Sequence, residues 1–229
     1  MQSNRENSID RIIFGDNQFF GVDHLSEARA REKMAKFKDT KKIIDVLDSC
    51  YDLGIRTFMC TTYERIWEIG DHFRDNSHKY HDYKFYPCMP YAHKYANSVT
   101  ELGILGTLKY YAGGNIAGTL AKGGMALAKR DLFGAMKLLV DSEMKMFHDL
   151  NTPVIFLQNV VTDLLLGLGM TEFFVEFSDY IEEKYNAEAG FITMNLPLLV
   201  DELDRIGLAN PIVCSSINKI GFRMSGSID

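Results

Sequence analysis

The sequence has no closely spaced pair of cysteines. Its four cysteines are far apart, each within an apolar stretch: Cys50, Cys60, Cys88 and Cys214. This spacing excludes a CxxC motif and argues against a disulfide framework, so we expect reduced thiols in the core. The histidines form no HxH or HxxxH pair, which argues against a His-based metal site, and we expect no bound metal.

A basic cluster and a long apolar run are also missing. The 25 Lys and Arg residues stand against 31 Asp and Glu residues, for a net charge of −6. A mildly acidic chain matches phosphate backbones poorly, so no nucleic-acid partner is expected. The most apolar stretch, residues 154–170, is interrupted by polar residues, so no membrane span is expected. The opening MQSNRENSID lacks the pattern of a signal peptide, and the expected location is cytoplasmic.

The chain does contain a regular alternation of short apolar strands and amphipathic helices. Strands are expected at residues 11–14, 56–60, 83–89, 152–157, 189–194 and 211–214. Helices are expected at residues 25–38, 40–53, 64–73, 171–181 and 198–206. Apolar strands alternating with helices predict a parallel sheet covered on both faces. The turn GDNQFFG lacks the GxGxxG fingerprint of an open dinucleotide-binding sheet, which favours a barrel.

Three irregularities modify this plan. Pro87 lies in the third predicted strand and demands an edge position, a bulge or an early end. Residues 90–151 far exceed the dozen or so that a crossover needs, so we expect a helical insertion at residues 95–150 of a single domain spanning residues 1–229. A closed eight-stranded barrel takes about 250 residues, and only about six units are recognisable.

The predicted fold class is therefore α/β, of the (β/α)8 TIM-barrel type, truncated after about six units. Two explanations of the truncation stay open. The chain is a fragment of a longer protein, or a partner subunit covers the open edge, which makes a homo-oligomer an expected partner arrangement.

Polar side chains follow every predicted strand, where parallel barrels carry their functional residues. The ionisable catalytic candidates are Tyr63, His93, Lys94 and Lys219. The substrate-binding candidates are Asp16, Asn17, Gln18, Thr61, Thr62, Gln158, Asn159, Asn195, Ser215, Asn218 and Arg223. Loops face water in any barrel, so polar strand ends also suit a purely structural protein, and both interpretations stay open.

Individual candidates suggest different chemistry. Tyr63 could donate a proton to a carbonyl oxygen, and His93 could act as a general acid or base. Lys219 could form a Schiff base if desolvated, or bind an anion together with Arg223. A tyrosine packed on the barrel rim and a solvated loop lysine are the structural alternatives.

The order of units resembles the aldo-keto reductase family. The resemblance lies in GIRTFMCTTYERIWEIGDHF, VIFLQN, AGFITMNLPLLVDELDRIG and PIVCSSINKIGF, and covers most of residues 11–95 and 152–223. It implies a barrel that reduces carbonyl compounds with NADP through an Asp, Tyr, Lys and His set. Cys60 stands at the aspartate position, Gln158 at the histidine position, and Met89 or Pro90 at the lysine position. Tyr63 lies about two residues before the tyrosine position, so the shared scaffold is expected without the family's catalytic set.

The first functional hypothesis is an aldo-keto-reductase-like oxidoreductase that acts on a small polar metabolite in the barrel mouth, with NADP as cofactor. A lysine-centred lyase using Lys219 is the enzymatic alternative. A non-catalytic binding or assembly module, with the methionine-bearing insertion as its contact surface, belongs to a different class.

Overall fold

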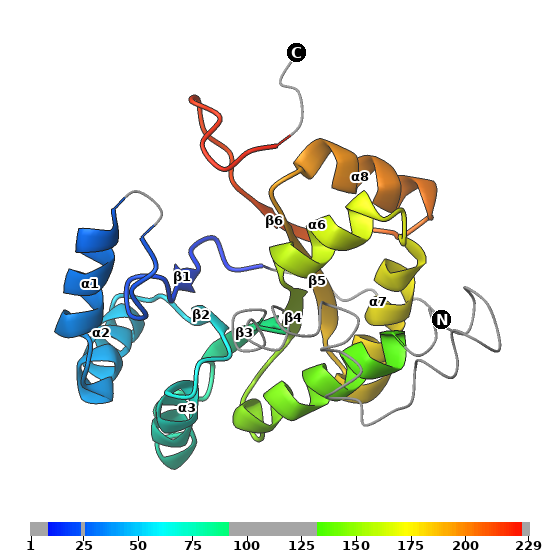
Figure 1. Ribbon diagram of the computed structural model, residues 1–229. Coiled ribbons are helices and arrows are strands. Elements are labelled where there is room, and N and C mark those ends of the chain that lie inside the picture. The colour runs from blue at the N-terminus through cyan, green and yellow to red at the C-terminus, as the bar shows by residue number, and fades with distance from the viewer. Residues whose placement is uncertain (1–8, 24–25, 92–131, 226–229) are drawn as a thin grey trace.

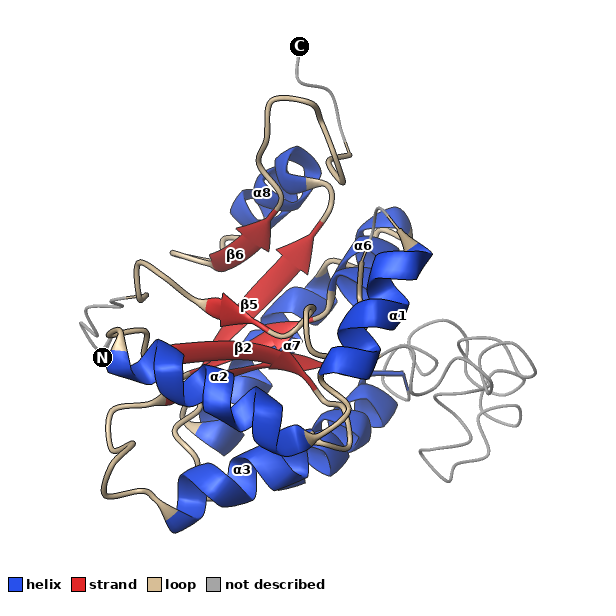
Figure 2. Cartoon of the chain, turned by 90° about the vertical axis from the view of Figure 1, so that its left-hand side faces the viewer, coloured by secondary structure: helices blue, strands red, loops and turns tan. Residues whose placement is uncertain are grey.

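The computed structural model describes residues 9–23, 26–91 and 132–225. Six strands form one all-parallel sheet in the order β1-β2-β3-β4-β5-β6, and the sheet curls into a half-barrel (Figures 1 and 2). The strands are β1 (Phe14–Gly15), β2 (Thr57–Thr61), β3 (Lys84–Met89), β4 (Val154–Leu157), β5 (Glu188–Thr193) and β6 (Ile212–Ser215). The predicted parallel α/β sheet is confirmed as a half-barrel.

The helices follow the strands along the chain. They are α1 (Glu27–Lys36), α2 (Thr40–Asp52), α3 (Ile66–Asp75), α6 (Asn159–Gly167), α7 (Glu172–Tyr185) and α8 (Leu196–Arg205). Residues 132–144 of the predicted insertion are also helical and lead into the short 3-10 helix η2 (Lys145–Phe147). None of the helices within the described residues is long and apolar enough to cross a membrane.

Helix α2 shows how local sequence sets these boundaries. The Asp39 carboxylate accepts a hydrogen bond from the Lys41 backbone N–H (2.9 Å), which caps the first turn. Gly54 follows the last turn with φ of 89°, a left-handed conformation in which glycine has no steric penalty. Helix α6, by contrast, lies in a stretch that the sequence does not mark as a helix.

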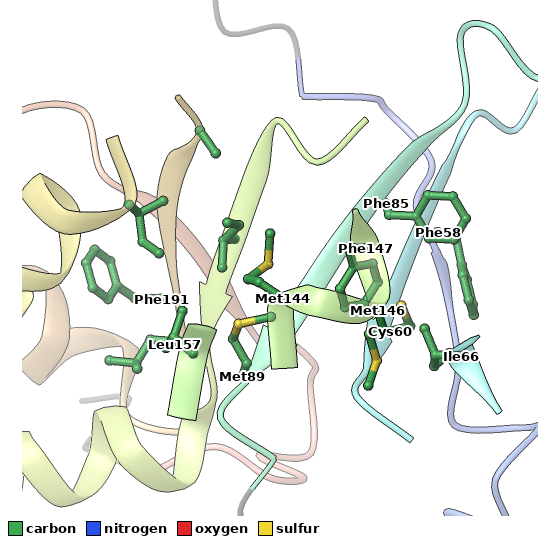
Figure 3. Packing of buried hydrophobic residues seen from close by; sticks show 14 of the residues in the cluster. Phe58, Cys60, Ile66, Phe85, Met89, Met144, Met146, Phe147, Leu157 and Phe191 are labelled. Atoms are coloured by element: carbon green, nitrogen blue, oxygen red, sulfur yellow. The ribbon is translucent and has the colours of Figure 1, made fainter. Parts of the chain in front are cut away.

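Alternation along the strands separates two apolar layers. One face carries Phe58, Phe85 and Phe191 and packs against the helices. The opposite face of the curled sheet carries a smaller cluster with Tyr86 and Phe156 at its centre. Figure 3 shows part of the helix-covered layer, in which Met144 and Phe147 lie with Met89 and Phe85. The end of the insertion is therefore part of the main core.

Of the edge position, the bulge and the early end that Pro87 left open, the edge position is excluded, because β3 lies between β2 and β4. The Lys84 N–H points to the β2 side, where it donates to the Arg56 carbonyl, and the Phe85 N–H points to the opposite side. Alternation therefore places the missing N–H of Pro87 on the β4 side. The pairing of β3 with β4 begins only at Cys88, one residue later, so Pro87 stands just before this ladder and not within it.

Candidate functional site

All six strands run in the same direction, so their carboxyl ends lie at one edge of the sheet. The first three strands end in a connected set of polar side chains. We call Asp16, Thr61, Tyr63 and Tyr91 the mouth row, because the Thr61 hydroxyl bonds to Asp16 and the Tyr63 ring, two residues on, contacts the Tyr91 ring. The sequence had identified three of these four residues as separate candidates.

Asp16 begins the mouth row just beyond β1. Its side chain is buried, with the residue only 7% exposed. One carboxylate oxygen, Oδ2, accepts from the Thr61 backbone N–H (2.8 Å) and from the Thr61 hydroxyl (2.5 Å). Burial raises the pKa of Asp16, and the hydrogen bonds from Thr61 oppose this effect without cancelling it. None of the ion pairs among the described residues involves Asp16.

Tyr63 continues the row. A tight turn places it, because its N–H donates to the Thr61 carbonyl (3.0 Å) and brings the chain back over the end of β2. Its ring stacks on Phe20 (centroids 4.0 Å apart) and contacts Tyr91 (4.6 Å). Burial is the largest of the effects that raise the pKa of Tyr63, so the phenol keeps its proton near neutral pH.

Glu143 holds the end of β3 against the insertion. It belongs to the helix at residues 132–144, and it is completely buried. The Thr62 hydroxyl donates to Glu143 Oε2 (2.6 Å), and the Tyr91 backbone N–H lies 3.1 Å from both carboxylate oxygens. Thr62 therefore anchors Glu143, which in turn positions Tyr91.

Glu143 was not among the candidates predicted from the sequence. A signal was present, since Glu143 lies three and four residues after Val140 and Leu139, which are both buried on the same helix. An acidic residue on an apolar helix face indicates a buried partner. The identity of that partner could not be inferred, because Thr62 lies 81 residues away in the chain.

The candidates after β4 and β5 have structural contacts. Gln158 is buried, and its backbone N–H donates to the Met89 carbonyl (3.0 Å), which fixes the start of α6. Asn159 is the first residue of α6. The Asn195 side chain caps α8 by accepting from the Leu198 N–H (3.3 Å). These contacts explain the polar strand ends without a ligand.

The remaining candidates lie in turns and in the loop after β6. The exposed Asn17 and the half-buried Gln18 form the turn after β1, where the Gln18 amide donates to the Gly15 carbonyl (2.5 Å). Asn218 Oδ1 accepts from the Phe222 N–H (2.9 Å) and shapes the last loop. Three further candidates differ in exposure: Ser215 and Arg223 are half-buried, and Lys219 is exposed. Exposure leaves Lys219 without the desolvation that a Schiff-base lysine needs. His93 and Lys94 lie outside the described residues.

The residues that stand at the catalytic positions of the aldo-keto reductase resemblance are buried. Cys60 and Met89 are fully buried on the helix-covered face. Burial raises the pKa of the Cys60 thiol well above its ordinary value. Asp16, which comes from β1, bonds to Thr61, the residue directly after Cys60. A carboxyl group thus reaches the end of β2 from a neighbouring strand.

Neither a metal site nor the groove on the helical layer adds to the mouth row among the described residues. Among the described residues, no three His, Cys, Asp or Glu side chains lie together as a metal site requires. An open groove on the helical layer is lined by Thr171, Glu172 and Arg205. It contains no residue of the mouth row, and the Arg205 guanidinium already bonds to the Thr171 hydroxyl (2.8 Å).

Comparison with known proteins leaves the family undecided. No family model matches the chain, and no similar curated protein or solved structure was found. The aldo-keto reductase resemblance therefore stays a prediction from the sequence pattern. The chain is assigned here to a fold, an all-parallel half-barrel, and to no family.

Proposed function

We propose that the chain is an enzyme that acts on a small polar metabolite at the carboxyl ends of its strands, with Tyr63 as the group that transfers a proton. The observation that carries this proposal is the mouth row. The Tyr63 phenol is half-buried, keeps its proton near neutral pH and contacts the Phe20 and Tyr91 rings. A protonated phenol at the edge where parallel barrels carry their functional residues suits a general acid.

More specifically, we propose that this enzyme reduces carbonyl compounds with NADP as its cofactor. A phenol that stays protonated at neutral pH can give its proton to a carbonyl oxygen as that oxygen gains negative charge. A nicotinamide nucleotide also requires cationic groups for its phosphates, and Lys219 and Arg223 follow the end of β6 at the same edge of the sheet. These two residues would hold the phosphates, and the bound nucleotide would supply the hydride.

The test is a screen of small aldehydes and ketones with NADPH, followed by the absorbance of the reduced nucleotide. For any compound that reacts, we expect Tyr63→Phe to lower kcat by about 10²–10⁴-fold, because only the hydroxyl is removed and the stacked ring stays. Tyr83→Phe is the matched control, since Tyr83 is buried and its hydroxyl has no hydrogen-bond partner among the described residues. Equal rates for Tyr63→Phe and wild type would contradict the proposal.

Assembly with a second copy of the chain is a second candidate, favoured by the free side of β6. This strand pairs only with β5 in the described sheet. The loop after it exposes Ile217 (79%) and Ile220 (85%). An unpaired strand edge beside exposed apolar side chains is a common place for chains to associate. Light scattering should show a dimer that Ile220→Lys dissociates, and a strict monomer would remove this candidate.

A further inference from the structure

The turn between α1 and α2 is a positively charged surface at one end of the half-barrel. We call residues 36–42 the basic turn. Phe37 and Thr40 are buried, and the Asp39 carboxylate caps α2. The turn therefore exposes four lysines that are interrupted in the sequence and were not predicted as a basic cluster: Lys36, Lys38, Lys41 and Lys42. None of these lysines forms an ion pair with another described residue.

The outer side of α7 carries the opposite charge. Residues 172–204 hold nine Asp and Glu residues and only one Lys. Three exposed carboxylates follow at helical spacing on the side of α7 away from its buried phenylalanines, and we call them the acidic stripe: Glu176, Asp179 and Glu183. The single cation of this segment, Lys184, is already paired with Asp141. Like charges three and four residues apart weaken a helix, so the stripe is a surface that an added cation would stabilise.

A groove runs beside the acidic stripe, between α7 and the end of α8. Val175 and Ile206 give the groove an apolar lining, and Glu172 and Glu176 add carboxylates to it. Its volume of about 590 Å³ is that of a pocket and not of a flat surface. The stripe and the groove together offer both charge and apolar area to a docking segment.

The two charged surfaces lie at opposite ends of the sheet, each near a free strand edge. Helices α1 and α2 lie at the end with β1 and β2, and helices α7 and α8 lie at the end with β5 and β6 (Figure 1). Among the described strands, β1 pairs only with β2, and β6 pairs only with β5. Exposed apolar side chains accompany both edges, Ile12 before β1 and Ile217 after β6.

We propose that this chain associates head to tail with a second copy, so that the basic turn of each copy docks on the acidic stripe and groove of the other. The two contacts are equivalent, and in a pair of chains they close a ring with two-fold symmetry. The same arrangement turns the β6 edge of one copy toward the β1 edge of the other. The inference rests on the second proposed function, assembly with a second copy, and names the surfaces that make the contact.

The distribution of charge favours a second copy over a nucleic acid or an anionic membrane. The basic turn contributes +3 to the net charge of −6, so the rest of the chain carries −9. A polyanion would attract the turn and repel that remainder. A second copy offers both signs, because its stripe meets the turn of the first copy while its own turn meets the stripe of the first.

The experiment measures the mass of the full chain by light scattering. We expect a pair of chains at about 50 mM salt and a dissociation constant that rises at least about tenfold by about 500 mM salt, because salt screens contacts between exposed charges. Lys41→Glu/Lys42→Glu and Glu176→Lys/Asp179→Lys should each be monomeric alone at the lower salt. An equal mixture of the two variants should form pairs again, because one contact is then native and the other has its charges exchanged.

Asp52→Lys/Asp75→Lys is the matched control, because both residues are exposed outside the two surfaces and the variant has the same net charge as Glu176→Lys/Asp179→Lys. It should form pairs alone and should not restore pairing to Lys41→Glu/Lys42→Glu. Circular dichroism verifies that each variant is folded.

Pairs that persist in either charge-reversed variant, or a mixture that stays monomeric, overturn the head-to-tail contact. A pair that Ile220→Lys dissociates while the charge reversals leave it intact keeps the assembly function and overturns this inference alone. A wild-type chain that is monomeric at both salt concentrations, whether or not it binds a DNA duplex, overturns both.

Discussion

Gly190→Ala is the substitution whose effect the structure specifies most closely. Gly190 is buried in β5, directly opposite Phe156 of β4. A Cβ atom at Gly190 would lie 2.4 Å from two carbons of the Phe156 ring. Unbonded carbons prefer about 3.5–4.0 Å, so the ring would have to move by roughly 1 Å or more. Phe156 is 3% exposed and packs beside Tyr86 (centroids 6.0 Å apart), which leaves little space for that movement.

Overpacking of this kind costs about 1–3 kcal/mol, and the lower chain entropy of alanine in the unfolded state offsets up to about 1 kcal/mol. We therefore expect a net loss of about 1–2 kcal/mol in the free energy of unfolding. For a domain of this size the melting temperature should fall by about 2–8 °C. Urea unfolding followed by circular dichroism measures the first quantity, and a thermal scan measures the second.

Gly134→Ala is the control, because Gly134 is exposed on the helix at residues 132–144 and nothing lies within 4 Å of the added atom. The same change should there increase stability by about 0.5–1 kcal/mol, through helix propensity. A Gly190→Ala variant as stable as wild type would show that Phe156 does not lie over Gly190. Combining Gly190→Ala with Phe156→Leu should recover part of the loss, since the smaller side chain leaves room for the methyl group.

Three further predictions concern buried or bonded side chains. The raised pKa of Asp16 means that the folded state holds the proton more tightly than the unfolded state. The stability of the wild-type protein should therefore fall as the pH rises from the ordinary pKa of 3.8 through the higher folded pKa. Asp16→Asn should remove this fall, which urea titrations at several pH values measure. Asp141 is the opposite case. Burial raises its pKa, but hydrogen bonds from Lys184, Tyr180 and Tyr185 outweigh burial, so the net pKa of Asp141 is lowered. The stability that Asp141 contributes is therefore present above the ordinary pKa and is lost as the pH falls through the folded pKa. Asp141→Asn should cost about 1–3 kcal/mol at pH 7 and much less at a pH below the folded pKa of Asp141. Tyr83→Phe should leave stability unchanged or raise it by about 1 kcal/mol in thermal melts, because it removes a buried hydroxyl that has no partner among the described residues.

The regular parts of the fold could be predicted from local sequence. The capped helix that begins after Asp39 and the strands of apolar residues were predicted to within a few residues. Helix α6 was missed, because the run NVVTDLLLG has polar residues only at Asn159, Thr162 and Asp163 and shows no clear amphipathic period. Pro87 left an edge, a bulge and an early end open, because the side of the strand to which each N–H points depends on the register with both neighbours.

The site was predictable as a set of positions and not as a set of contacts. Polar residues after the strands identified Asp16, Thr61 and Tyr63 separately. Their connection depends on the stagger of β1 against β2 and on the turn that brings Tyr63 back over Thr61. Asn195 is the converse case, because its position after β5 indicated a ligand while its side chain caps α8. Local sequence does not distinguish a cap from a binding residue.

The strand order also has a consequence for how the protein is made. Every strand pairs with the strand completed just before it, so the sheet can grow at one edge as the chain leaves the ribosome, and no strand has to enter between two that are already paired. The long interval falls between β3 and β4, at residues 90–153. At about 5–20 residues per second, growth pauses there for roughly 3–13 s with one side of β3 unpaired. The segment that supplies Glu143, which holds Tyr91 of the mouth row, thus also sets the slowest step in laying down the sheet.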